Sequence, residues 1–127
     1  MRLRLPAILL ASATLAGCGG EDDEPGATAT VPSGSAVVVK GDEYSFDPET
    51  LVVTGGGDLK VTFQNDGALA HNMRIERGGD DVGGSPTFQG GGEKRDFSLS
   101  LEPGEYKLIC TVGNHEELGM TGKLEVR

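Results

Sequence analysis

Hydrophobic and polar residues alternate along most of the chain after residue 35. In these stretches every second side chain is apolar, which is typical of strands with one face buried. The alternating stretches are residues 59–63, 71–76, 97–101, 106–110 and 124–126. Denser apolar runs at residues 37–39 and 51–53 fit strands as well. The pattern therefore predicts many short strands and no long helix.

Turn-forming residues separate the predicted strands. Glycine, proline, asparagine and aspartate cluster at residues 47–48, 55–57, 65–67, 78–79, 90–92 and 103–104, and these residue types favour tight turns. Seven to eight short strands in roughly 90 residues fit an all-β, Greek-key β-sandwich better than a helical fold. Residues 77–96 are the least regular part, and we expect a long glycine-rich connection between the two sheets there.

The first residues of the chain form an export signal rather than part of a fold. Arg2 and Arg4 precede an apolar stretch that ends at Ala16, too short to span a bilayer but typical of a secretory signal. The sequence Leu-Ala-Gly-Cys that ends at Cys18 resembles a bacterial lipobox, whose cysteine is lipidated after cleavage. We expect residues 1–17 to be removed and Cys18 to anchor the protein to the outer face of the cytoplasmic membrane. An ordinary cleavage site beside an unrelated cysteine is the alternative.

Residues 18–35 differ in composition from the part of the chain that follows. After Cys18 they are acidic or polar and carry almost no large apolar side chains, so they bury too little surface to offset the entropy lost on ordering. We therefore expect a flexible tether over residues 18–35 and one domain over residues 36–127, which is long enough for a single small core.

The chain is acidic, with 20 Asp and Glu against 11 Lys and Arg and a formal net charge of −9. Removal of residues 1–17 would take away two basic residues and no acidic ones. This charge argues against nucleic acid as a partner, because a phosphate backbone attracts basic surfaces. An acidic balance otherwise indicates only solubility.

Four side chains suggest a metal site. Cys110, His115 and Met120 lie in one loop, with four residues between each neighbouring pair. His71 lies upstream on a predicted strand. The alternation of apolar and polar residues places His71 on the inward face of its strand, together with its apolar neighbours. The same alternation places Cys110 on the inward face of its own strand. A thiolate, two imidazoles and a weak axial thioether define a blue-copper site. We expect one copper ion there, with His71 as the more buried imidazole.

Zinc and a binuclear copper centre fit these four residues less well. Zinc prefers four strong ligands and is poorly served by a thioether, and a binuclear copper centre would require a second cysteine in the loop. Taken singly, a methionine or cysteine is usually a core residue, and we expect that role for Met73. The combination favours copper, because an exported protein with one unpaired cysteine needs a reason to keep a free thiol.

The loop from Cys110 to Met120, together with the upstream Ala70-His71-Asn72 and the turn at residues 103–106, resembles the plastocyanin/azurin group of cupredoxins. The resemblance covers residues 36–127. One departure is Gly113-Asn114, where many such loops have Pro-Gly before the second histidine. Asparagine tolerates left-handed backbone geometry, so the turn can form, and we expect the glycine to make it looser.

This resemblance implies a function as well as a fold. It implies His71, Cys110, His115 and Met120 as the ligands of one type 1 copper ion, and Asn72 as the residue that steadies the cysteine loop by hydrogen bonding. A protein of this kind carries one electron at a time. We expect no enzyme, because all four copper positions are occupied by protein and none is open to a substrate.

Two further functions stay open at this point. In a copper chaperone or storage protein the metal would be cargo and would be handed over. A binding module of the same shape would hold no metal at all.

The surface near His115 is the expected docking site for a redox partner. Leu69 and Leu118 are candidates for a small apolar contact patch. Glu116 and Glu117 would steer a basic partner such as a c-type cytochrome, or only keep the loop soluble. A membrane-bound oxidase or reductase is a further candidate partner, and we expect the protein itself to be a monomer.

Overall fold

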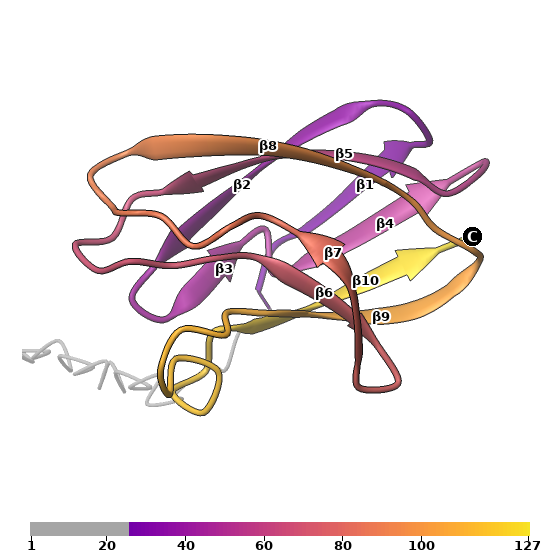
Figure 1. The fold of residues 1–127 in the computed structure, drawn as a ribbon. Helices are drawn as coiled ribbons and strands as arrows, with labels where there is room; N and C mark the ends of the chain where they lie inside the picture. Colours follow the sequence, from indigo (N-terminus) through magenta and orange to yellow (C-terminus); the bar gives the residue numbers. More distant parts are fainter. Residues whose placement is uncertain (1–25) are drawn as a thin grey trace, which may run out of the picture.

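The computed structural model describes residues 26–127, which form β-strands, turns and loops without a helix (Figure 1). Residues 26–127 accordingly contain no helix that is long and apolar enough to cross a membrane. The predicted signal sequence, Cys18 and the first part of the predicted tether lie outside the described residues.

The strands form two sheets, which lie against each other as the two layers of a sandwich (Figure 1). The larger sheet has the spatial order β1 (Thr28–Pro32), β4 (Thr50–Thr54), β10 (Thr121–Val126), β9 (Gly104–Ile109), β6 (Arg74–Arg77) and β7 (Asp80–Gly84). The smaller sheet has the order β3 (Ser45–Asp47), β2 (Ala36–Asp42), β5 (Asp58–Asn65) and β8 (Glu93–Ser100). The predicted all-β sandwich is confirmed.

The core forms where the inward faces of the two sheets meet. Buried and exposed side chains alternate along β2 and β5, as period two requires when one face of a sheet is wet. Phe63 is fully buried at the centre of β5, and its ring meets Phe46 and Phe88 edge-on with centroids 5.8 and 5.6 Å apart. Leu51 and Leu108 are fully buried in the opposite sheet. Each such side chain stabilises the fold by about 1.5–3 kcal/mol relative to an exposed one.

Parallel pairing determines which end of the sandwich each strand starts from. β4 pairs in parallel with both β1 and β10, so all three strands start at the same end. Glu49 joins these starts, because its side chain accepts the N–H of Gly26 at 3.0 Å and its carbonyl accepts that of Lys123 at 2.9 Å. β10 begins directly after Met120, so the described chain begins at the end of the sandwich that carries the loop from residue 110 to 120.

The predicted boundary between tether and domain at residue 36 is too late. Residues 28–32, inside the predicted tether, form β1, and Ala29 and Val31 pack partly buried against the core. Composition misled the prediction because an edge strand does not need large apolar side chains. The hydrogen bonds to β4 and the two small inward-facing side chains are enough to hold β1 in the sheet.

Two further corrections concern the strands themselves. Residues 26–127 form ten strands where seven to eight were predicted, since β1 and the short β3 and β7 carry little apolar alternation. Within residues 77–96 the chain forms the β6–β7 hairpin and the start of β8. The connection predicted for this whole segment is therefore shorter, because residues 85–92 alone lead from β7 in one sheet to β8 in the other. His71, predicted on a strand, lies before β6 and makes an isolated bridge to Phe88.

Candidate metal centre

The four candidate ligands come together at one end of the sandwich. Cys110 follows the last residue of β9, Met120 precedes the first residue of β10, and His115 lies in the loop between them. His71 reaches the same place from the neighbouring segment, whose backbone pairs with Phe88 through two hydrogen bonds of 3.1 Å. Two segments that are distant in the sequence, residues 110–120 and the segment of His71, therefore meet at one point.

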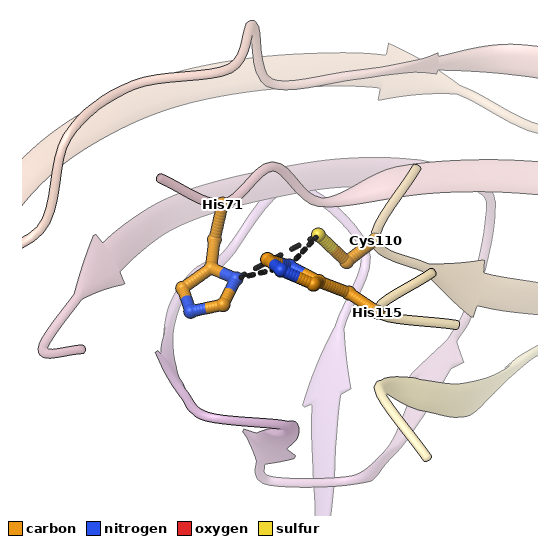
Figure 2. Close-up of side chains that lie close together, drawn as sticks. All are labelled: His71, Cys110 and His115. Atoms are coloured by element: carbon orange, nitrogen blue, oxygen red, sulfur yellow. Dashed lines mark hydrogen bonds between the residues drawn. The ribbon is translucent and has the colours of Figure 1, made fainter. Parts of the chain in front are cut away.

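Three donor atoms converge in the interior. The Nδ1 atoms of His71 and His115 are 3.0 Å apart, and Cys110 Sγ lies 3.8 and 3.6 Å from them respectively (Figure 2). Donors bound to one ion at about 2.0–2.3 Å lie roughly 3–4 Å from one another, so this spacing fits a single metal. All three residues are buried. Cys110 forms no disulfide among the described residues.

Met120, the fourth candidate ligand, lies at the end of the loop that carries Cys110 and His115. Its side chain is fully buried and packs near Gly41 of β2, where an added Cβ would clash with the Phe63 ring at 2.6 Å and lie 3.2 Å from Met120 Cε. Its backbone closes the loop, because its carbonyl accepts the N–H of Cys110 at 3.1 Å and its N–H donates to the carbonyl of His115 at 3.0 Å. The thioether is thereby fixed on the same short loop as the thiol and one imidazole.

The turn before His115 differs in detail from the expectation. Gly113 adopts the left-handed conformation, with φ of +49°, whereas Asn114 does not, because no residue other than glycine has a positive φ among the described residues. Glycine takes that geometry without steric cost. The turn closes with a hydrogen bond of 3.0 Å from the His115 N–H to the carbonyl of Val112.

Asn72 connects the two ligand segments. Its side-chain amide donates to the hydroxyl of Thr111 at 2.7 Å and to that of Thr87 at 3.0 Å, while its carbonyl oxygen accepts the Thr111 N–H at 2.9 Å. Thr111 directly follows Cys110, so Asn72 lies where the resemblance to cupredoxins implies it should steady the cysteine loop.

Three residues that support the site were not predicted from the sequence. Asn65 is fully buried and donates to the carbonyls of Leu69 and Phe88 at 3.0 and 3.1 Å, which fixes the segment leading to His71. The remaining two are Glu43 and Tyr44, in the turn between β2 and β3. These three residues lie in or beside turns, and no spacing relates them to the ligands, so the sequence offers no signal for their role.

The turn between β2 and β3 contacts both imidazoles. Glu43 Oε1 lies 3.0 Å from His71 Nε2 and accepts the N–H of Leu69 at 2.9 Å. The Tyr44 ring packs tilted against His115 with centroids 4.9 Å apart and meets His71 edge-on at 6.4 Å. One turn thus covers the outer side of the candidate site.

Electrostatics favour a neutral His115 and an ionised Glu43. Burial lowers the pKa of His115 below its usual value and the nearby His71 lowers it further, against a smaller opposing effect of Glu43. The pKa of the Glu43 carboxyl is lowered to about 2, chiefly by the Leu69 N–H, with His71 also contributing. A neutral imidazole keeps the lone pair that a metal needs.

The predicted docking residues lie around the site with unequal exposure. His71 is fully buried and His115 is 8% exposed. His71 is thus the more buried imidazole, as predicted, although His115 is less exposed than expected. Leu69 and Leu118 are 45% and 49% exposed. Glu116 forms an ion pair with Lys107 at 2.5 Å, which partly neutralises the charge predicted to steer a partner.

Comparison with known proteins decides the family. The family model described as copper binding proteins, plastocyanin/azurin family, matches residues 33–127. The chain belongs to this family. No curated protein sequence gives a significant match. Since cupredoxins of this family hold copper through such donors, His71, Cys110, His115 and Met120 form a single copper site.

Solved structures of cupredoxins share the fold. Auracyanin from the photosynthetic bacterium Roseiflexus castenholzii superposes with a TM-score of 0.67 at 20% identity, covering 75% of this chain and 98% of that one. Auracyanin A from Chloroflexus aurantiacus, a "blue" copper protein, gives 0.65 at 26% identity over 76% and 100%. Rusticyanin from Thiobacillus ferrooxidans gives 0.62 at 24% identity over 77% and 82%. Family and site together support a blue-copper electron carrier.

Replacing Met120 with leucine tests its axial role in this cupredoxin. We expect Met120→Leu to keep copper bound and to raise the reduction potential, because an apolar axial group favours Cu(I) and leucine has a similar volume. Met73, also fully buried, is the matched control, and Met73→Leu should leave the potential unchanged. Spectroelectrochemistry gives both values. Loss of copper from Met120→Leu, or an unchanged potential, would contradict the assignment.

Proposed function

We propose that this cupredoxin is a one-electron carrier on the outer side of the cytoplasmic membrane. The observation that carries the proposal is the convergence of two imidazole nitrogens and one thiol sulfur within 3.8 Å in a buried site. Bound copper supplies a Cu(II)/Cu(I) couple that exchanges a single electron.

The protein supplies rigidity and exclusion of water. Cys110, His71 and Met120 are fully buried, and backbone hydrogen bonds close the loop that carries two of them. A ligand set held in this way cannot adapt to the different geometries that Cu(I) and Cu(II) prefer, so little rearrangement accompanies electron transfer. With all four donors supplied by protein, we propose no catalytic turnover at this site.

Burial also separates this proposal from copper delivery or storage. Handing copper over requires a partner's ligands to approach the metal, yet three of the four donors here are fully buried. A carrier should therefore keep its copper in both oxidation states when challenged with chelators. Ready transfer of Cu(I) to a chelator at equal concentration would favour the delivery function instead.

The absorption spectrum with Cu(II) tests the carrier function. One equivalent of Cu(II) should give an intense blue or green colour from thiolate-to-copper charge transfer, and ascorbate should bleach it reversibly. Cys110→Ser should abolish the band with an unchanged circular dichroism spectrum, because the sandwich core is formed by other residues. Cys18→Ala is the matched control and should keep the charge-transfer band. A Cys110→Ser protein that retains the visible band would exclude the proposed site.

The point at which the domain begins supports placement beside a membrane. β1 starts at the same end of the sandwich as the copper site. If Cys18 carries the lipid, nine residues separate it from Thr28, and the ten steps between the two residues span at most about 35 Å. The anchor would then hold the copper end close to the membrane surface, within reach of a membrane-bound redox protein.

Cell fractionation tests the anchor. Cys18→Ala should move the protein from the membrane to the soluble fraction, because a lipid chain at that position would be absent. The copper spectrum of the released protein should be unchanged. Membrane association that survives the replacement would rule out Cys18 as the anchor.

A partner would dock at the copper end. His115 is the more exposed of the two imidazoles, and Leu69 and Leu118 supply exposed apolar surface on the segments beside the ligands. Glu117 is exposed on the same loop and is better suited to steering than Glu116, whose carboxylate is paired with Lys107. A basic c-type cytochrome would complement this surface.

Salt dependence of the electron-transfer rate tests this docking. Stopped-flow rates with a basic cytochrome should fall as salt rises, because salt screens attraction between exposed charges. Glu117→Gln should flatten that dependence more than Glu116→Gln. Glu102, which precedes β9 at the opposite end, has a 90% exposed side chain and is paired with Arg77 as Glu116 is with Lys107, so it provides the matched control for Glu116. An equal effect of Glu102→Gln would remove the loop from the docking site.

A further inference from the structure

The two ring nitrogens of His71 have different partners. Nδ1 faces the converging donors, 3.0 Å from His115 Nδ1, whereas Nε2 points away from them and lies 3.0 Å from Glu43 Oε1. A carboxylate at neutral pH only accepts hydrogen bonds, so Nε2 carries the proton in this contact. Nδ1 is then left with its lone pair directed into the copper site.

The surroundings of Glu43 fit a carboxylate in this place. Its Oε1 also accepts the N–H of Leu69 at 2.9 Å, so one oxygen is held by two donors. Gly67 provides the space, because a Cβ there would clash with the same oxygen. The side chain of Glu43 is 27% exposed and His71 is fully buried, so water has limited access to the contact.

Strand register explains why this residue reaches the ligand. β2 and β5 run parallel, with Gly41 paired to Asn65, so the residues after each strand leave the sheet side by side. The Asp66 N–H donates to the carbonyl of Gly41 at 2.8 Å and joins the two exits. The pairing of β2 with β5 therefore places Glu43 beside the segment that ends at His71.

We propose that Glu43 is a positioning residue that fixes the tautomer of His71 and, through its charge, lowers the reduction potential of the bound copper. The inference rests on the proposed copper function. A carboxylate that accepts the outer N–H of a metal-bound histidine orients the ring and makes the imidazole more basic. A more basic ligand and a nearby negative charge both favour Cu(II) over Cu(I).

The isosteric replacement Glu43→Gln tests the role of the charge. The amide oxygen can still accept from His71 and Leu69, so the fold and the ring orientation should persist while the negative charge is lost. We expect the affinity for Cu(II) to fall at least tenfold relative to that for Cu(I). For a one-electron couple this is an upward shift of the potential by about 59 mV, measured by spectroelectrochemistry.

Asp42 provides a matched control on the same turn. Its carboxylate accepts the N–H of Glu43 at 2.8 Å, a bond that asparagine can preserve, and no hydrogen bond joins it to His71 among the described residues. Asp42→Asn removes the same unit charge next to Glu43 and should change the affinity ratio less than threefold. An equal shift in both variants would show a general effect of charge and would overturn the role of Glu43.

Nuclear magnetic resonance gives a measurement that does not depend on the potential. In the diamagnetic Cu(I) protein, the Nε2 proton of His71 should be visible and protected from exchange, and Glu43→Ala should make it exchange rapidly. An unprotected Nε2 proton in the unmodified protein, or an unchanged potential in Glu43→Gln, would overturn the inference. If the unmodified protein still shows the blue band, the copper function survives that outcome, whereas absence of the band would refute both.

Discussion

Two imidazole nitrogens and a thiol sulfur are held close together in the interior of this sandwich, and this crowding is the constraint on which the rest of the site depends. Polar atoms are costly to bury without partners. Two imidazole nitrogens 3.0 Å apart, with a thiol sulfur 3.6–3.8 Å from them, are well placed to share one metal cation. The fold around them must therefore hold the donors in place before the metal arrives.

Three sets of contacts hold the donor side chains in place. The backbone bond between Cys110 and Met120 closes the ligand loop, Asn72 ties that loop to the segment of His71, and the buried Asn65 fixes the same segment from behind. Networks of this kind are stable only when every buried polar group has a partner. Among the described residues no buried side-chain nitrogen or oxygen lacks one, so the donors sit on a rigid frame.

The frame also determines how the copper end faces its surroundings. Parallel pairing brings the start of β1 to the copper end, and the turn between β2 and β3 covers the two imidazoles with Glu43 and Tyr44. In the proposed function these features act together. The anchor would keep the copper end near the membrane, while the turn adjusts the potential at which the electron is exchanged.

Local patterns in the sequence predict the strands of the core and the four donors. Period-two alternation is a local property of each strand, and the spacing of Cys110, His115 and Met120 lies within one loop, so both can be read without knowing the fold. Even the inward direction of His71 followed from parity, although it lies in a bridge and not in a strand.

Contacts between segments that are distant in the sequence become visible only in the folded structure. The composition of β1 resembles that of a tether, because the strand is stabilised by hydrogen bonds to β4, which composition does not reveal. Glu43 reaches His71 across 28 positions of sequence because β2 and β5 pair in a particular register. Strand pairing is a non-local choice, and a shift by one residue would turn the same side chains to the opposite face of the sheet.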